Sequence, residues 1–515
     1  MKIPIVCIAC LAALGRAAVA HAQPTPPPEP AQVAPPFDLT VPPGLLAASI
    51  KSPAARNATV DLRQKPPSGH AEGRACEGCP KRSVGKSLFQ VTIINVAYEA
   101  ANLIRGQVTA RITPKTWWDN MENGWVWDLD DFKVNQIGHP YQGNNYYTAG
   151  RANGLSFYES AAVTAFGSGT WEYFGETNLP SLNDFLNTTL GGIALGEMFH
   201  RAGWLVRNTR ATGRGRLWSE IGAMALDPVT GANRFITGDA SRVTEKPASL
   251  VPSSLGGLMA AGVLWRGSET RAIDARGQPF VEMDLLYGDP KTGRSLTPYE
   301  AFAVRLRFGG GAGFSEAKVR GRLAGMPIKN SNFQFSVLQS YDFQTNDAYS
   351  TGSQSFEAAV ALTHRLSTRT SMWLMGWGGA TVLGAIDSLP LGVTEAPEEP
   401  ELGEESPGQG VSEGPRFYDY GPGGNFGFMA EFARNGRTFA LFSYEGRHLS
   451  SLDGVRANHF LGRTRLDLLL PLRGRFGFGT SAEYLVRHTY YQDADRTERR
   501  YRYPQFRTYF TWRLS

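Results

Sequence analysis

The side chains best suited to chemistry lie between Trp117 and Arg207, where acids, amides and imidazoles gather more densely than elsewhere in the chain. Groups of these kinds build acid–base and ligand-binding sites when a fold brings them together in one cavity. The candidates are His139, Arg151, Glu172, Glu176, Asn183, Asp184, Glu197 and His200. We hypothesise that the carboxylates and both imidazoles could converge, which would make this segment the functional centre.

One interpretation of these residues is a hydrolase that acts on lipid acyl groups beside a membrane. His139 would be the general base, Glu172 or Asp184 would orient it, and Ser156 or Ser168 would be the nucleophile. The other five candidates, Arg151, Glu176, Asn183, Glu197 and His200, would bind the ligand. The sequence has no G-x-S-x-G nucleophile elbow to support this mechanism.

A metal centre is the second interpretation, because Glu197 and His200 are spaced three apart, as in helix-borne Glu-x-x-His ligands. A di-iron bundle needs two such motifs, and this segment has one. We therefore predict no metal site and no cofactor.

The third interpretation is structural, and we favour it for most of these residues. Buried acids and amides can form a satisfied hydrogen-bond network that fixes helix packing. Arg151 would pair with a carboxylate, and Asn183 or Asp184 would close helix termini. Pro140 and its neighbouring glycines would then be turn residues, and the tryptophans would be anchors at a membrane interface (Trp125, Trp127, Trp171).

Helices are expected to position these groups in a module over residues 86 to 245. Apolar residues recur every three or four positions from Leu88 to Ile104, which indicates one helix. A second is expected over 154 to 166, and a third from the N-cap Ser181 to about residue 206. On the third helix, Gly192 and Gly196 would let another backbone approach closely.

The segment from 85 to 245 resembles a family of outer-membrane proteins of Gram-negative bacteria that is known only as a domain of unknown function. The similarity is carried by His-Pro-Tyr-Gln-Gly at 139 to 143, Trp-Glu-Tyr at 171 to 173, Asn183-Asp184, and the run from Gly191-Gly192 to Gly196-Glu197. The resemblance implies a shared architecture, and it implies no reaction.

From about residue 255 onward the apolar pattern has a period of two. In the last ten residues, for example, Phe506, Phe510, Trp512 and Leu514 alternate with polar side chains. Such alternation is typical of a strand with one face toward lipid and the other toward water. We predict a transmembrane antiparallel β-barrel of about twelve strands over residues 246 to 515, with centres near 260, 283, 304, 319, 337, 360, 375, 429, 442, 465, 482 and 508. A soluble β-sandwich is the alternative.

The first 22 residues are typical of a signal peptide, with an apolar stretch before Ala20-His21-Ala22. Residues 23 to 85 are expected to be a Pro-rich disordered linker. Cys76 and Cys79 would be the only cysteines left after cleavage, and in an oxidising compartment we expect them to form a local disulfide.

Export combined with a barrel predicts the outer membrane as the location, with outer-membrane lipids and the barrel-assembly machinery as partners. A formal charge of +5 over 515 residues, without a basic cluster, indicates no nucleic-acid partner. We expect the helices to plug or cap the periplasmic side of the barrel. The expected role is binding or passing a lipid or small amphiphile, with a lipid hydrolase and a pore or structural protein as alternatives.

Overall fold

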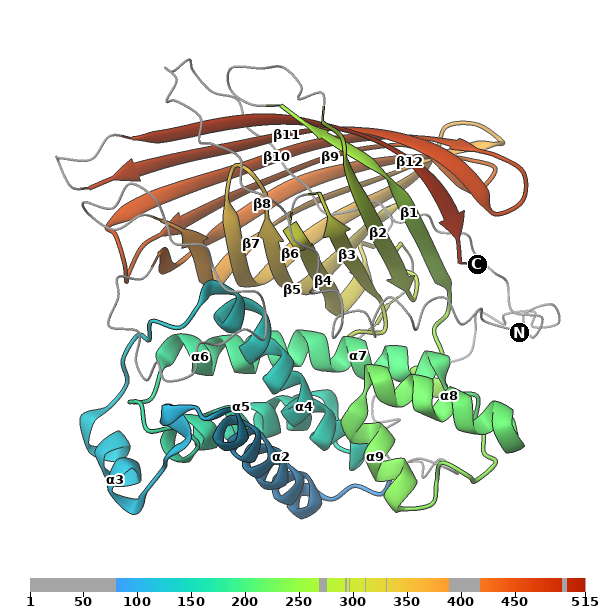
Figure 1. Ribbon diagram of the computed structural model, residues 1–515. Coiled ribbons are helices and arrows are strands. Elements are labelled where there is room, and N and C mark those ends of the chain that lie inside the picture. Colours follow the sequence, from blue (N-terminus) through green and yellow to red (C-terminus); the bar gives the residue numbers. More distant parts are fainter. Residues whose placement is uncertain are drawn as a thin grey trace.

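Twelve antiparallel strands close into a barrel in which each strand pairs with its sequence neighbours and β1 pairs with β12 (Figure 1). The computed structural model describes residues 80–267, 276–291, 294–295, 297–310, 312–329, 331–388, 417–492 and 498–514. The strands are β1 (Leu255–Arg266), β2 (Gln278–Tyr287), β3 (Phe302–Gly309), β4 (Ala312–Pro327), β5 (Phe333–Thr345), β6 (Ser350–Arg365), β7 (Thr370–Asp387), β8 (Tyr418–Arg434), β9 (Arg437–Ser450), β10 (Ala457–Pro471), β11 (Phe476–Tyr491) and β12 (Arg499–Arg513). The predicted barrel is confirmed, and every predicted strand centre falls within a strand.

The two ends of the barrel can be told apart by the strands that begin and end there. We call the end where β1 begins and β12 ends the terminal rim, and the other end the opposite rim. Because the strands alternate in direction, β2 ends at the terminal rim, whereas β7 ends and β8 begins at the opposite rim.

Side chains alternate between the two faces of the barrel wall, as the period-two pattern predicted. On β10, Arg463, Arg465 and Asp467 are almost fully buried, whereas Leu466, Leu468 and Leu470 are exposed. The barrel is therefore polar inside and apolar outside, the reverse of a water-soluble protein.

The helices form one module that precedes the strands. They are α2 (Val84–Arg105), α3 (Pro114–Asn123), α4 (His139–Ala152), α5 (Phe157–Phe174), α6 (Leu182–Leu186), α7 (Gly192–Val206), α8 (Gly213–Leu226) and α9 (Pro228–Ile236). Single turns of π-helix precede α4 (η5, Val134–Gly138) and join α6 to α7 (η6, Asn187–Gly191), and a 3-10 turn (η7, Ala248–Leu250) leads to β1. Ser181 caps α6 as predicted, since its hydroxyl accepts a hydrogen bond from the Asp184 backbone N–H at 3.2 Å.

Close backbone packing joins α4 to the α7 segment. A Cβ atom built on Gly192 would lie 2.5 Å from Gly143 Cα, and one built on Gly196 would lie 2.6 Å from the Tyr147 side chain. The expectation that another backbone approaches closely is therefore confirmed at Gly192, whereas Gly196 makes room for the Tyr147 side chain. The stretch from His139 to Gly143, expected to hold turn residues, instead opens α4, where Pro140 lies in the first turn and needs no N–H.

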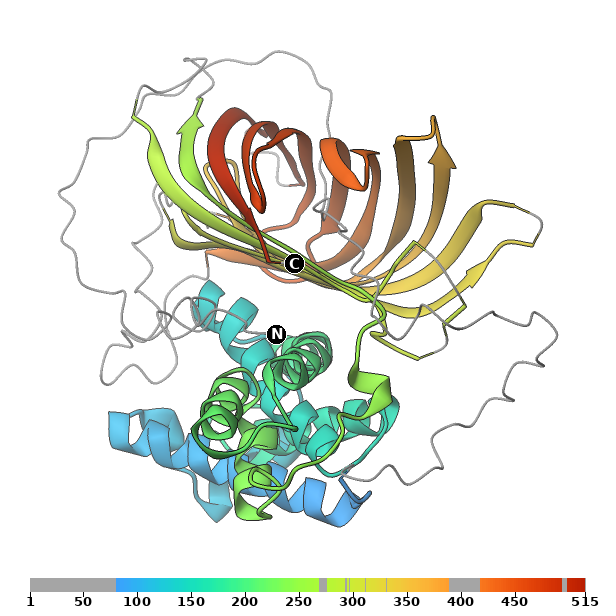
Figure 2. The ribbon, with the colours of Figure 1, turned by 90° about the vertical axis from the view of Figure 1, so that its right-hand side faces the viewer.

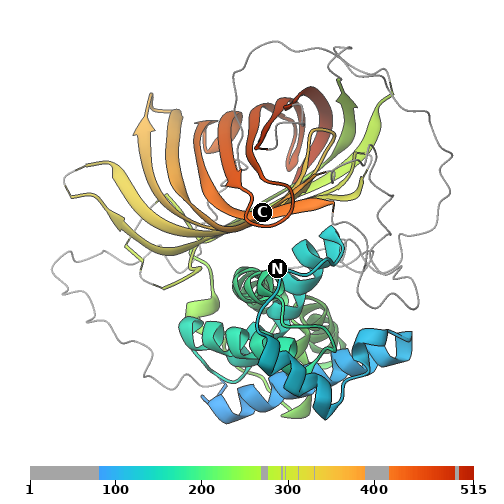
Figure 3. The same cartoon turned by 90° about the vertical axis from the view of Figure 1, so that its left-hand side faces the viewer.

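The module lies against the outer wall of the barrel, as the end-on views show (Figures 2 and 3). Side chains of η5, α5 and α7 share an apolar core with outward-facing residues of β3, β4, β5, β7 and β8. Hydrogen bonds fix the contact: Tyr341 donates to the Gln136 carbonyl at 2.7 Å, and Gln339 Nε2 donates to the Leu190 carbonyl at 3.1 Å. The expectation that the helices plug or cap the periplasmic side of the barrel is wrong.

The helix that carries Glu172 ends at Phe174, so Glu176 lies in the segment that follows it. One further local expectation needs correction. Trp171 is 3% exposed and lies in the helical core, where its indole cannot anchor the chain at a membrane interface. Across the described part of the chain, none of the helices combines the length and hydropathy needed to cross a membrane. The signal peptide, the linker up to residue 79 and the Cys76–Cys79 disulfide lie outside the described residues.

Candidate functional site

The predicted polar residues separate into two buried groups within the helical module. The first, which we call the acidic cluster, contains Asp128, Glu172, Glu176 and Asp184 together with His139 and Asn183. Asp184 Oδ1 lies 3.5 Å from His139 Nε2 and accepts a hydrogen bond from Asn183 Nδ2 at 2.9 Å. The Ser181 backbone N–H donates to Glu172 at 2.8 Å, and the Trp171 indole donates to Glu176 at 2.7 Å.

Burial controls the protonation of the acidic cluster. It raises the pKa of Asp184 well above the ordinary value, and the adjacent Asp128 carboxylate adds to this shift. Burial likewise raises the pKa of Glu172, with a further contribution from Glu176, and raises the pKa of Glu176 to about 7. The pKa of His139 is lowered by burial. Glu172 and Asp184 are therefore held as neutral acids beside a neutral His139 imidazole.

Neither serine considered as a nucleophile is bonded to His139. Ser156 caps α5 by accepting a hydrogen bond from the Glu159 backbone, and Ser168 donates to the Phe185 carbonyl at 3.4 Å. The hydroxyl beside His139 Nδ1 belongs to Thr188, at 3.2 Å. The catalytic roles of His139, Glu172 and Asp184 therefore remain predictions, now with Thr188 as the neighbouring hydroxyl.

The second buried group is centred on Glu197, which is fully buried on α7. Its carboxylate pairs with Arg201 at 2.7 Å and with Arg151 at 3.0 Å, and Tyr147 donates a hydrogen bond to it at 2.8 Å. Burial by itself would raise the pKa of Glu197, but the two guanidinium groups hold that pKa below the ordinary value. This is the paired, satisfied arrangement that the structural interpretation expected for Arg151.

His200 lies one turn after Glu197 and is occupied by a different partner. Its Nδ1 lies 3.0 Å from Asp227 Oδ2, at the N-cap of α9. Burial lowers the pKa of His200, although Asp227 acts in the opposite direction. Hydrogen bonds through Ser181 and Asn183 thus link Glu172, Asp184 and His139, whereas Glu176, Glu197 and His200 each have separate partners. Within the described ranges, no three His, Cys, Asp or Glu side chains are placed to hold a metal ion.

A larger polar assembly, which the sequence did not single out, fills the barrel lumen. We call it the lumen belt, and it contains two sets of ion pairs. One set joins Glu282, Asp284, Arg305, Arg307, Glu316, Arg463, Arg465, Glu483 and Arg507, and the other joins Lys318, Arg320 and Glu445. Its pairs cross the lumen between distant strands: Arg463 of β10 reaches Glu316 of β4 at 2.9 Å, and Lys318 of β4 reaches Glu445 of β9 at 2.7 Å. In the sequence, the belt appears only as acidic and basic residues at alternate positions of the strands. Which of them pair across the lumen cannot be read from the order of the residues.

A lumen cavity of about 80 Å³ lies beside the belt. Its walls are partly apolar, with Leu338, Trp373, Met375 and Met429 among them, and Lys291, Arg320 and Arg322 supply positive charge. Lys291, from the loop between β2 and β3, pairs with Glu431 at 2.8 Å and lies 5.1 Å from the centre of the Trp373 ring.

Arg322 differs from the other cations of this cavity. It is 5% exposed, and its Nε and Nη1 atoms have no hydrogen-bond partner among the residues that the structure describes. The acids that act on its charge, Glu300 and Asp289, come from the β2–β3 loop. A buried guanidinium with open donors is costly, so such a group is a candidate for binding an anion.

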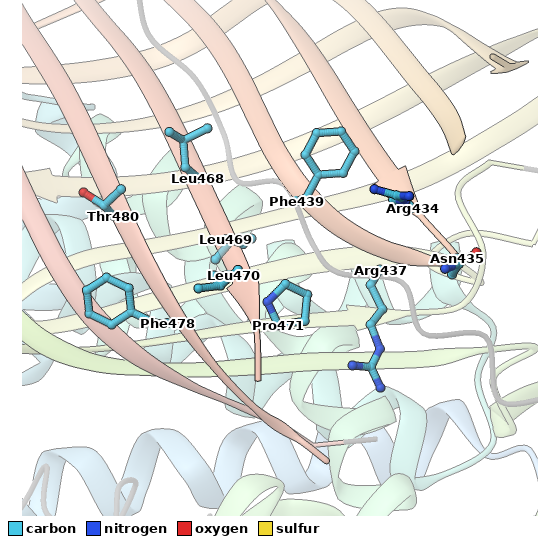
Figure 4. Close-up of a pocket in the computed structure, with 10 residues that line it drawn as sticks. All are labelled: Arg434, Asn435, Arg437, Phe439, Leu468, Leu469, Leu470, Pro471, Phe478 and Thr480. Carbon is cyan, nitrogen blue, oxygen red and sulfur yellow. The ribbon is translucent and has the colours of Figure 1, made fainter. Parts of the chain in front are cut away.

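The outer wall carries a different feature at the terminal rim, where Arg434 and Arg437 flank the turn between β8 and β9. Beside them, Phe439, Leu468 and Phe478 form an apolar surface on the barrel exterior (Figure 4). Cations next to an outward apolar wall suit the boundary between lipid head groups and acyl chains.

Residues 124–229 match the family model described as a domain of unknown function (DUF3943). This match confirms the resemblance inferred from the sequence, and it covers α4 to α8 with the acidic cluster and Glu197. No curated protein matches the chain. Because the domain has no assigned activity, the match supplies no reaction.

Solved structures with a similar arrangement of strands include outer-membrane porins. The NanC porin is 8% identical, with a TM-score of 0.26 over 49% of this chain and 98% of its own. The KdgM porin in complex with disordered oligogalacturonate is 5% identical, with a TM-score of 0.22 over 50% of this chain and 98% of its own. The toluene transporter TodX of Pseudomonas putida is 6% identical, with a TM-score of 0.20 over 52% of this chain and 90% of its own. Likenesses this weak carry no functional argument, and the fold rests on the strand pairing itself.

Proposed function

We propose that this chain is an outer-membrane protein whose closed barrel binds a small anionic amphiphile. The membrane location is supported by the outer wall, where Phe426, Phe460, Leu468, Phe478 and Phe510 are all exposed. Exposed apolar residues on this scale are expensive in water and favourable in hydrocarbon. The buried, charged lumen completes the polarity expected of a transmembrane barrel.

Binding is favoured over passage because the lumen belt ties opposite walls together. Arg463 is 1% exposed and contacts both Glu316 and Glu483, so a permeating solute would have to break buried, charge-assisted bonds. An open porin keeps such charges on its walls around a water-filled channel. The paired belt supports a barrel that does not conduct.

The observation that carries the proposal is the unsatisfied Arg322 guanidinium beside an apolar wall in the lumen cavity. A carboxylate or phosphate would supply the acceptors that Nε and Nη1 lack. Leu338, Trp373 and Met429 would cover the first carbons of an attached chain. We therefore propose that the ligand is an anion with a short apolar group. This narrows the lipid or small amphiphile expected from the sequence to one chemical class.

Calorimetric titration with octanoate, on the whole protein in non-ionic detergent, tests this proposal. Hydrogen bonds to a charged group contribute about 1.5–3 kcal/mol, so Arg322→Met should weaken octanoate binding by about tenfold or more. Arg365→Met, at an exposed position near the end of β6, is the matched control and should bind as the native protein does. Equal affinity in Arg322→Met and native protein, or no binding by native protein, would refute the proposal.

A further inference from the structure

We infer that membrane lipid covers the outward face of the helical module, so that the module lies within the bilayer beside the barrel. The inference rests on the proposed membrane location of the barrel, and it is independent of any ligand in the lumen. It concerns the surface of the module that the barrel leaves uncovered, formed chiefly by α2, α5, α8 and α9.

The position of the module on the wall is the first step. Its contacts begin at Tyr287, the last residue of β2, and Phe302, the first residue of β3, both at the terminal rim. They continue across Val319 of β4 and end at Tyr418 and Tyr420, the first residues of β8 at the opposite rim. The module therefore extends along the wall from rim to rim, and it occupies the same depth as the strands that cross the membrane.

The outward face of α2 is the second step. Phe89, Ile93, Val96 and Ile104 follow helical spacing on one side of α2 and are between 51% and 87% exposed. All the exposed residues from Phe89 to Ile104 are uncharged. α2 lies on the side of the module away from the barrel (Figures 1 and 2), so no part of the barrel covers this face.

The same composition continues over the neighbouring helices. On α8, Leu217, Trp218 and Ile221 are exposed, and Ile236 at the end of α9 is 82% exposed. Phe166 on α5 is also exposed. An isolated exposed apolar residue needs no explanation, but a soluble monomer rarely exposes a large apolar surface that spans several helices.

Charge in the module follows the opposite rule. Glu197 and Glu220 are fully buried, and each is paired with buried arginines inside the helix bundle. Exposed ion pairs lie in the segments that connect helices, as Arg210 with Glu245 does, and on α3, where Lys115 pairs with Asp119. The module is thus polar within and apolar along the outward faces of α2, α5, α8 and α9, apart from charged side chains near helix ends such as Arg105 and Arg214. A surrounding of lipid accounts for the apolar surface of the barrel, for the apolar surface of the module, and for the position of the module from rim to rim.

Site-directed fluorescence quenching tests the inference on the whole protein. In a background with Cys76 and Cys79 replaced by serine, the variants Ile93→Cys and Trp218→Cys are labelled with an environment-sensitive maleimide. The protein is reconstituted into phosphatidylethanolamine–phosphatidylglycerol vesicles with or without brominated acyl chains. Phe478→Cys on the barrel wall is the lipid-facing control, and Arg210→Cys is the aqueous control.

We expect brominated lipid to quench the labels at positions 93 and 218 as it quenches position 478, and iodide to quench them much less than position 210. Iodide quenching equal to that of position 210, with position 478 still lipid-quenched, would overturn this inference alone. If position 478 were also open to iodide and untouched by brominated lipid, the membrane location itself would fail. If the labels were protected from both quenchers and the introduced cysteines formed disulfide crosslinks between copies, the outward face would be covered by a second copy of the chain. That result would also overturn the inference.

Discussion

The contact between Gly143 and Gly192 fixes the distance between α4 and α7, and Gly192→Ala tests whether the packing of the module depends on it. The added Cβ would lie 2.5 Å from Gly143 Cα, whereas carbon atoms in contact are about 3.5–4.0 Å apart. The atoms that the new Cβ would meet belong to the Gly143 backbone, so the clash cannot be relieved by a side-chain rotation. The two helices must separate by about 1 Å, and overpacking of this kind costs about 1–3 kcal/mol.

This cost can be measured as a shift in the melting temperature of the module. For a unit of 150–250 residues, about 1 kcal/mol lowers Tm by roughly 2–4 °C, so Gly192→Ala should lower Tm by between about 2 and 12 °C. Far-UV circular dichroism at a helix-sensitive wavelength follows the module, and heat-modifiable electrophoretic migration reports separately on the barrel. The barrel should migrate as in the native protein.

Gly215→Ala is the matched control, because it makes the same chemical change in α8 where no atom lies within 4 Å of the new Cβ. Alanine is favoured over glycine in a helix by about 0.5–1 kcal/mol, so this variant should melt at the native temperature or slightly above it. A Gly192→Ala protein as stable as Gly215→Ala would show that the close contact does not limit packing, and the reasoning would fail.

Three other predictions concern buried polar side chains. Glu316→Gln removes a charged partner of buried Arg463 and should destabilise the barrel by about 3–5 kcal/mol, measured by urea titration followed by heat-modifiable migration. The double variant Glu316→Leu with Arg463→Met should recover most of this loss. Equal loss of stability in the single and double variants would count against the belt. Glu176→Gln keeps the acceptor for Trp171 but cannot ionise. Because the pKa of Glu176 is raised from 4.5 to about 7 in the native protein, its contribution to stability is lost as pH rises through that window. In thermal melts, the Glu176→Gln variant should be as stable as the native protein below about pH 4.5. Above about pH 7 its free energy of unfolding should be higher by up to about 3 kcal/mol. His139→Ala should leave phospholipid and lipid A profiles unchanged by mass spectrometry, since neither Ser156 nor Ser168 is bonded to the imidazole. Altered profiles would revive the hydrolase hypothesis.

The candidate site was only partly predictable from the sequence. Arg151 does pair with a carboxylate, because a buried arginine in a helical segment needs an acid partner wherever the helices meet. The expected meeting of His139 with His200 did not occur, since Asp227, a residue without any motif, binds His200 instead. Spacing along one helix placed Glu197 and His200 correctly on α7, but it could not say which partner each would meet across the bundle.

The sequence by itself determined the strands of the barrel, because side chains on a strand alternate between its faces and this local rule leaves a period of two in the residue order. It also determined that Ser181 begins a helix and that Gly192 allows close approach, which are local properties of residue type and backbone. Only the tertiary structure decided that Glu316 meets Arg463 across the lumen, and that the helices lie on the outer wall. Both depend on contacts between residues far apart in the chain, whose partners are chosen by closure of the sheet and by packing of complementary surfaces.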